Sequence, residues 1–198
     1  MNAFSYLVQR LGKTRWMVHV IAWSVCLGLW TGVCQLARAD GALTEYQVKA
    51  LFLLNFIKYV DWPANSFADS NAPITIGICG ESKLREALNA AVAGKSVGGR
   101  AIVIRQVEST DDFRPCHILF ISDAASSRMR ACLEKASAFP ILTVGEGAAF
   151  AQNGGMINFV LKNGNVRLEI DLSAARKAGL TISSRLLAVA DVVKGKPD

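Results

Sequence analysis

Short apolar runs, separated by turns and by amphipathic segments, make up most of the chain between residues 74 and 193. The runs at 74–79 and 116–122 are almost continuously apolar, which is typical of parallel strands covered on both faces. Between the runs, apolar residues recur at helical spacing. We predict strands over 74–79, 101–107, 116–122, 141–144, 156–161 and 166–172, and helices over 82–93, 126–138, 147–152, 173–178 and 183–193.

Thr44 and Gln47 stand three residues apart at the start of a further apolar segment. This spacing is typical of a capping box, in which the threonine side chain bonds forward and the glutamine side chain bonds back. The predicted helix continues to Val60 and ends before Trp62-Pro63, because helical backbone is disfavoured just before a proline. Its polar residues do not gather on one face, which predicts burial on several sides; the alternative is that part of it packs against a partner.

Asn163-Gly164 separates the last two predicted strands. Both residues accept positive φ, so the pair favours the tight turn of a β-hairpin. The earlier strands are separated by predicted helices, as parallel strands require. We therefore predict one α/β domain, with a mixed, largely parallel central sheet flanked by helices and a C-terminal antiparallel hairpin.

The first 39 residues have a different pattern. Basic residues at positions 10, 13 and 15 precede an apolar run over 16–33, and Ala37-Arg38-Ala39 follows it. Such a sequence is typical of a secretory signal peptide with a small-x-small cleavage site. We predict cleavage after Ala39, which leaves residues 40–198 as the single domain; the alternative is a retained membrane anchor.

The signal peptide changes what the charge implies. The whole chain of 198 residues has 22 Lys+Arg against 16 Asp+Glu, a net charge of +6 that favours nucleic acid or a membrane surface as partner. Residues 1–39 contain four of the basic residues and none of the acidic ones, so the mature chain has 18 against 16, a net charge of +2. We therefore expect no nucleic-acid partner.

Catalytic motifs are weak in this chain. Gly94 to Gly98 matches the letters of a G-x-S-x-G nucleophile elbow, but a predicted helix precedes it where a strand is needed. Gly77 to Gly80 lacks the third glycine of a dinucleotide-binding turn. His117, within an apolar run, has no spacing typical of a triad or a zinc site, so we interpret it as structural. We expect no catalytic residue, metal or cofactor; an exported hydrolase or thiol enzyme using His117 or Cys132 is the remaining enzymatic alternative.

The mature chain keeps three cysteines, at positions 79, 116 and 132. In an oxidising compartment three thiols allow one disulfide and one leftover thiol. Cys79 ends one predicted strand and Cys116 begins another. If those strands were adjacent, parallel and in register, the two Cα atoms would lie beyond the roughly 7 Å limit for a disulfide. Residue patterns alone therefore leave the pairing open.

Short motifs follow one another between Tyr46 and Val193: Lys49-Ala50, Asn55-Phe56, Lys58-Tyr59-Val60, Trp62-Pro63, Gly77-Ile78-Cys79-Gly80, Gly99-Arg100, the run 116–122, the run 141–144, Phe150, the run 154–157 and the run 182–187. In order and spacing these motifs resemble the YfiR/HmsC-like family of periplasmic repressors. The resemblance covers nearly all of the mature chain.

The resemblance implies a function. A member would be a non-enzymatic periplasmic protein that binds the periplasmic domain of an inner-membrane diguanylate cyclase and represses it, so that it controls cyclic di-GMP and biofilm formation. An outer-membrane lipoprotein would sequester the repressor. The family's first disulfide would correspond to Cys79 and Cys116, leaving Cys132 as a free or intermolecular thiol. A second family disulfide has no counterpart, because residues 152–158 contain no cysteine.

Candidate partner contacts are Phe56, Tyr59 and Trp62, near the end of the first predicted helix, and Arg185. Aromatic residues and arginine are enriched at interface hot spots, although aromatic residues also fill protein cores. A homodimer is a further possibility. The alternative function is a periplasmic small-molecule-binding protein with a cleft at the carboxyl edge of the sheet, near Gly80.

Overall fold

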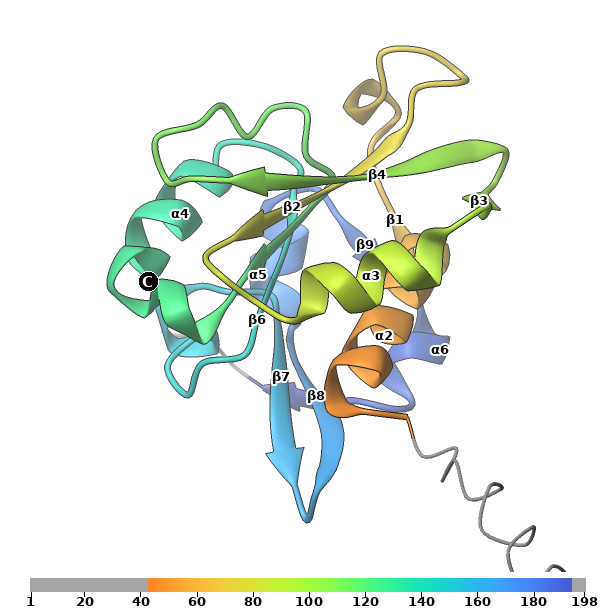
Figure 1. Cartoon of the computed structure of the whole chain (residues 1–198). Helices are drawn as coiled ribbons and strands as arrows, with labels where there is room; N and C mark the ends of the chain where they lie inside the picture. Colours follow the sequence, from red (N-terminus) through yellow and green to blue (C-terminus); the bar gives the residue numbers. More distant parts are fainter. Residues whose placement is uncertain (1–42, 194–198) are drawn as a thin grey trace, which may run out of the picture. The chain divides into compact units, whose positions relative to one another are not determined.

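A central eight-stranded sheet organises residues 43–193, the part of the chain that the computed structural model describes (Figure 1). The spatial order is β10-β8-β7-β6-β5-β2-β4-β3. The strands are β2 (Ile74–Cys79), β3 (Ser96–Val97), β4 (Arg100–Val107), β5 (Ile118–Ile121), β6 (Leu142–Gly145), β7 (Ile157–Lys162), β8 (Asn165–Asp171) and β10 (Asp191–Val193). The predicted signal peptide, residues 1–39, lies outside the described residues.

Parallel pairing holds the centre of the sheet together, from β4 through β2, β5 and β6 to β7. The antiparallel pairs are β7 with β8 and β3 with β4, and β10 pairs parallel with β8. This arrangement confirms the predicted α/β domain with a mixed, largely parallel sheet and an antiparallel hairpin. In the hairpin, Asn163 and Gly164 have φ values of 54° and 74°, as predicted from their residue types.

Helices cover both faces of the sheet. The helices are α2 (Glu45–Tyr59), α3 (Leu84–Val92), α4 (Met129–Ala136), α5 (Leu172–Lys177) and α6 (Ser184–Leu187), and the short 3-10 segments are η1 (Ala64–Ser66), η2 (Asp123–Arg128) and η3 (Ala151–Asn153). Helices α2, α3 and α6 pack on one face and α4 packs on the other (Figure 1). Within residues 43–193, no helix is both long enough and apolar enough to cross a membrane.

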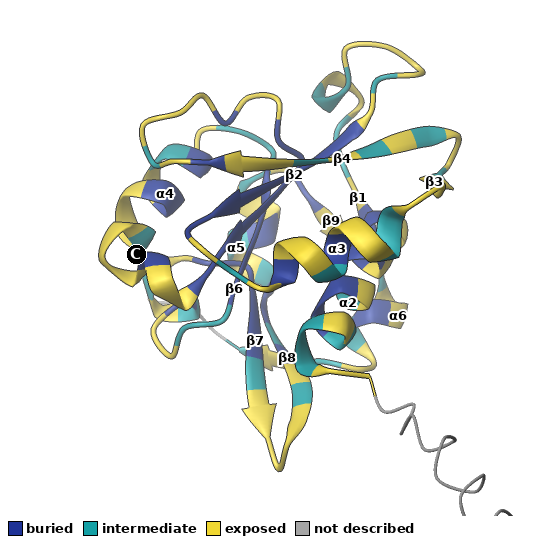
Figure 2. Cartoon of the chain, in the orientation of Figure 1, coloured by how far each residue is buried: buried dark blue, intermediate teal, exposed yellow. Residues whose placement is uncertain are grey.

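Two apolar cores result from the alternation of side chains along the buried strands. Ile76 and Ile78 of β2 face the helices α2 and α3, whereas Cys79 faces α4. The central strands are buried along their whole length, while the tip of the β7–β8 hairpin is exposed (Figure 2). The continuous apolar runs of the sequence are therefore the strands covered on both faces, as predicted.

The predicted capping box is present at the start of α2. The Thr44 hydroxyl accepts a hydrogen bond from the Gln47 backbone N–H at 3.3 Å, and the Gln47 amide oxygen accepts one from the Thr44 N–H at 2.8 Å. The expectation that its polar residues do not share a face is wrong: Gln47, Asn55 and Lys58 lie at helical spacing on one exposed stripe, and only Lys49 is buried with the apolar residues of the helix. The helix runs from the carboxyl edge of the parallel strands, where it begins, to the amino edge, where it ends.

Three predicted helices are wrong in extent. The one over 147–152 is a turn followed by the 3-10 segment η3. The predicted helix over 183–193 is only the single turn α6, and the chain then adds strand β10 to the sheet edge. Strand β10 gains its hydrogen bonds from β8, and this long-range pairing overrides a local pattern that resembles a helix. The predicted helix over 126–138 is divided between the end of η2 and the helix α4, which begins at Met129; within η2, Ala125 has non-helical backbone angles.

A second, two-stranded sheet joins β1 (Val60–Asp61) with β9 (Thr181–Ile182). The strands are antiparallel, with Val60 opposite Ile182 and Asp61 opposite Thr181. The Ser183 N–H also donates to the Tyr59 carbonyl at 2.8 Å. This ladder fixes the end of α2 against the segment that leads into α6.

Candidate functional site

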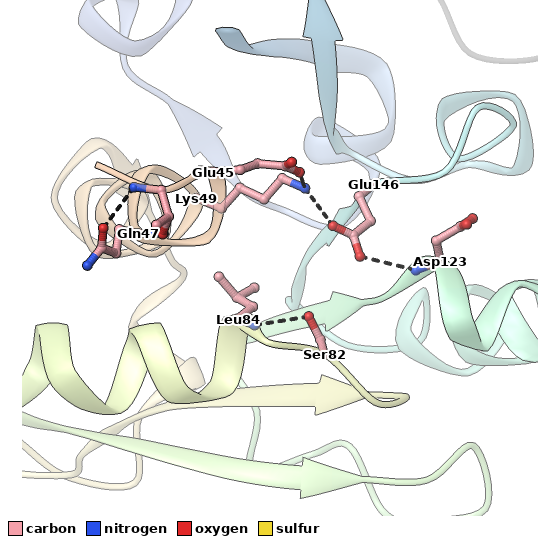
Figure 3. A network of polar contacts seen from close by, with 8 residues as sticks. Glu45, Gln47, Lys49, Ser82, Leu84, Asp123 and Glu146 are labelled. Atoms are coloured by element: carbon pink, nitrogen blue, oxygen red, sulfur yellow. Dashed lines mark hydrogen bonds and ion pairs between the residues drawn. The ribbon is translucent and has the colours of Figure 1, made fainter. Parts of the chain in front are cut away.

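Lys49 lies at the centre of a buried ionic cluster at the carboxyl edge of the sheet. Its ammonium group donates to Glu45, one helical turn earlier, and to the Glu146 Oε2 at 2.7 Å (Figure 3). The side chain of Lys49 is 5% exposed, and that of Glu146 is 11% exposed. A buried ammonium group is stable only when it is paired and hydrogen-bonded, and here two carboxylates satisfy it.

Glu146 connects three parts of the fold. Its Oε1 accepts a hydrogen bond from the Asp123 backbone N–H at 3.3 Å (Figure 3). Glu146 follows β6, Asp123 follows β5, and Lys49 belongs to α2. One carboxylate therefore ties the first helix to the ends of two adjacent parallel strands.

The cluster keeps Lys49 charged. Burial alone would lower the pKa of its ammonium group, but hydrogen bonds to Glu146 and Glu45, together with their negative charges, raise the pKa above its ordinary value. The ammonium group also lies 5.0 Å from the centroid of the Tyr46 ring, a cation–π contact. A lysine held in its charged form is suited to binding and positioning rather than to proton abstraction.

A cavity of about 460 Å³ opens beside this cluster. Its lining includes both glutamates, Lys49 and Asn158, whose Oδ1 is buried without a hydrogen-bond partner. The predicted cleft near Gly80 is displaced from that residue. A Cβ at Gly80 would lie 2.4 Å from the Ser122 Oγ, so the backbone there is closely packed. The cavity lies instead next to the residues that follow β5 and β6, and along β7.

His117 has the structural role that the sequence predicts. Its Nδ1 accepts a hydrogen bond from the Thr75 N–H at 3.1 Å, which leaves Nε2 as the donor to the Ser66 carbonyl, also at 3.1 Å. The ring stacks on Phe67 at 4.5 Å between centroids. Burial lowers its pKa and so favours the neutral form. Both ring nitrogens are occupied in holding backbone.

The three cysteines of the domain are buried thiols on the α4 side of the sheet. The Cys79 Sγ lies 3.2 Å from the Cys132 Sγ. Cys116 precedes β5, and its Sγ lies 2.9 Å from the position of a Cβ on Gly77. Gly77 and Cys79 are two residues apart on β2, a spacing of about 6.6 Å along a strand. The Cys116 sulfur therefore lies beside Gly77 rather than beside Cys79. The pairing of Cys79 with Cys116 does not fit this arrangement, and Cys132, expected to be left over, is the neighbour of Cys79.

The predicted partner contacts divide by burial. Phe56 is 0% exposed and stacks on Phe159 in the core, so this candidate is wrong as a direct surface contact. Tyr59 and Trp62 are half-buried, and Arg185 is exposed. The Trp62 Nε1 donates to the His117 carbonyl at 3.2 Å, which leaves only part of the indole at the surface.

The β1–β9 ladder places the backbone segments that carry the remaining candidates side by side. Tyr59 and Trp62 flank β1, and Arg185 lies three residues after β9, on α6. The ladder joins segments that are more than a hundred residues apart in the sequence. We call the group Tyr59, Trp62 and Arg185 the ladder corner. The residue types of the three candidates are visible in the sequence, whereas the pairing of the segments that carry them is not.

Sequence reasoning missed the Lys49 cluster. The one available signal was a lysine on the apolar side of a helix whose other lysine and amide side chains lie on the exposed side. The partner Glu146 is 97 positions away and carries no motif. Within residues 43–193, no group of three or more histidine, cysteine or acidic side chains is arranged to hold a metal ion.

Comparisons with known proteins agree on the type of domain. A family model described as YfiR/HmsC-like matches residues 46–191. Among solved structures, the chain is similar to a conserved domain protein from Vibrio cholerae O1 biovar El Tor, with a TM-score of 0.54 and 14% identity. The match covers 77% of this chain and 61% of that protein, so this chain spans less than two thirds of its length. At this identity the likeness shows the fold alone. No curated protein matches the chain.

Proposed function

Because the chain belongs to the YfiR/HmsC-like family, whose members are periplasmic regulators of cyclic di-GMP signalling, we propose that it represses a membrane diguanylate cyclase by binding the cyclase's periplasmic domain. The chain is exported by its N-terminal signal peptide, which is cleaved after Ala39. Binding holds the cytoplasmic catalytic domain of the cyclase inactive and so limits biofilm formation. An outer-membrane lipoprotein that sequesters the repressor releases the cyclase.

The ladder corner is the observation that supports this proposal. It combines two half-buried aromatic rings with an arginine, and these residue types dominate the hot spots of protein interfaces. The corner is also rigid, because the Tyr59 carbonyl and the Trp62 indole are both hydrogen-bonded to other segments. A rigid surface loses little conformational entropy on binding. We therefore assign the cyclase contact to Tyr59, Trp62 and Arg185.

Reversing the charge of Arg185 tests the contact. Arg185 is exposed and its guanidinium forms no ion pair within residues 43–193, so Arg185→Glu leaves the fold intact. We expect it to weaken binding at least about tenfold, the loss typical of an interface arginine. The measurement is retention of the mature chain on the immobilised periplasmic domain of a membrane cyclase, together with cellular cyclic di-GMP, which should rise.

Arg167→Glu is the matched control, because Arg167 is also exposed but lies on β8, in the hairpin. It should bind like the unsubstituted chain. If Arg185→Glu binds as tightly as Arg167→Glu, the ladder corner is not the contact surface. If the unsubstituted chain is never retained on the cyclase domain, the proposed repression is wrong.

The cavity beside Lys49 favours a second candidate, binding of a small molecule. Its volume of about 460 Å³ lies within the range of ligand pockets, and Asn158, one of its lining residues, has a buried Oδ1 without a hydrogen-bond partner. Under this hypothesis a compound from a metabolite panel raises the Tm of the mature chain by several degrees, and Asn158→Ala abolishes the rise. A flat response across the panel would eliminate this candidate without affecting the first.

A further inference from the structure

Cys79 and Cys132 form a close pair of buried sulfur atoms. Cys79 is the last residue of β2, and Cys132 lies on α4, which packs on that face of the sheet. Their Sγ atoms are 3.2 Å apart, and both residues are 0% exposed. A disulfide requires about 2.05 Å between the sulfurs, so an approach of about 1 Å completes the bond.

We propose that Cys79 and Cys132 are joined by a disulfide in the exported protein and that Cys116 remains a thiol. The proposal rests on the periplasmic location of the family, because disulfides persist in that oxidising compartment. It does not depend on the identity of the protein's partner.

Strand register explains why Cys116 is excluded. The β2–β5 pairing places Cys79 opposite Ile121, at the carboxyl end of both strands. Cys116 precedes the amino end of β5, where its sulfur lies over Gly77. Joining it to Cys79 would require a shift in register or a distortion of the loop before β5, whereas Cys132 requires only a small movement of a side chain.

The surroundings of the pair favour the reaction. The hydrogen bond from the Cys132 thiol lowers the pKa of Cys79, whereas the same bond and burial raise the pKa of Cys132. Cys79 is therefore the sulfur that becomes the attacking thiolate. For Cys116, burial raises the pKa, which leaves it the less reactive protonated thiol.

The chemistry is thiol–disulfide exchange with a disulfide-bearing oxidant, such as oxidised glutathione or a periplasmic disulfide donor. The Cys79 thiolate attacks one sulfur of the oxidant, which forms a mixed disulfide and releases one thiolate. The Cys132 thiolate then attacks the Cys79 sulfur and displaces the second thiolate. The protein loses two protons and two electrons, and the oxidant gains both as two thiols.

The bond connects strand β2 of the sheet to helix α4. The two cysteines are 53 positions apart, so the cross-link restricts a long loop of the unfolded chain. Reduction should therefore lower the Tm by roughly 10 °C for a domain of this size. Because both sulfurs are buried, exchange takes place before α4 docks, or when it opens.

The test is peptide mapping of the mature chain purified from the periplasm and, in parallel, of chain refolded in a buffer of oxidised and reduced glutathione. Free thiols are alkylated in denaturant without reductant before digestion. We expect a Cys79–Cys132 cross-linked peptide, lighter by two hydrogens than the sum of its parts, and alkylated Cys116. A cross-link that contains Cys116, or alkylation of all three cysteines, would overturn the proposal.

Thermal unfolding gives a second, independent measurement. Reductant should lower the Tm of the unsubstituted chain and of Cys116→Ala by a similar amount, and should leave the Tm of Cys132→Ala unchanged. A reductant effect that is lost in Cys116→Ala would contradict the assignment. Neither measurement involves a cyclase, so a failed disulfide and a failed repressor function are distinguishable.

Discussion

Gly145→Ala is expected to lower the free energy of unfolding by about 3 kcal/mol, a large part of the stability of a typical domain. Gly145 ends β6, and a Cβ there would lie 2.2 Å from Cδ2 of the Phe150 ring. A Cβ at Gly155 would lie 2.1 Å from Cε1 of the same ring. The Phe150 ring therefore packs between two backbone positions that must both lack a side chain.

Phe150 has no alternative position, because it is fully buried and its backbone is hydrogen-bonded to Gly147 and Gly155. The added methyl group must displace either the ring or β6, and Glu146 follows directly after Gly145. Urea-induced unfolding measures the loss. The control is Gly147→Ala in the same loop, where the nearest atom to an added Cβ is 3.6 Å away and no loss is expected.

A double variant separates steric overlap from other causes. If the overlap with Phe150 is the reason, Gly145→Ala combined with Phe150→Leu should be less destabilised than the sum of the two single substitutions. An unchanged urea midpoint for Gly145→Ala would show that the ring can move and that our account of this packing is wrong.

Lys49→Met should lower the free energy of unfolding by a similar amount, about 3 kcal/mol. Methionine has a helix propensity close to that of lysine and a side chain of similar length. The loss of stability therefore comes from leaving Glu146 buried without its cation. Lys58→Met on the same helix is the control, because Lys58 is exposed and its substitution should change stability by less than about 0.5 kcal/mol. Urea-induced unfolding at neutral pH is the measurement.

Restoring charge balance provides the internal test. Lys49→Met combined with Glu146→Gln removes the unpaired charge, so the double variant should be more stable than Lys49→Met alone. If the double variant loses the sum of the single effects, the two residues are not coupled, and the ionic cluster does not hold α2 to the carboxyl edge.

The pH dependence of the Lys49 contribution follows from its raised pKa. A lysine whose pKa is higher in the folded state binds its proton more tightly there. Its contribution is therefore complete below the ordinary value of 10.5 and is lost as the pH rises through the folded value. Between pH 6 and 9 the difference between the unsubstituted chain and Lys49→Met should remain nearly constant.

Features encoded by close neighbours could be predicted from the sequence. The capping box needs only Thr44 and Gln47, and the hairpin turn needs only two residues that accept positive φ. The buried strands were visible because each is apolar along its length. Such signals act over a few residues, and tertiary contacts in this fold reinforce them.

Features that depend on strand order could not be predicted. The contact of Cys79 with Cys132 and that of Lys49 with Glu146 each require the register and layering of the sheet, which no local pattern specifies. Phe56 illustrates the same limit, because the sequence pattern around an aromatic residue in a helix is the same whether its side chain packs in the core or contacts a partner. Only the position of β7 and its Phe159 distinguishes the two.

The pairing of Val60 with Ile182 also determines at which stage of folding the ladder corner is completed. A chain that crosses a membrane from its N-terminus delivers α2 first and the β9–α6 segment almost last. Closing so long a loop is slow compared with local folding. The ladder corner therefore forms only on a nearly complete molecule, so truncated or half-folded chains lack the surface that we propose as the partner contact.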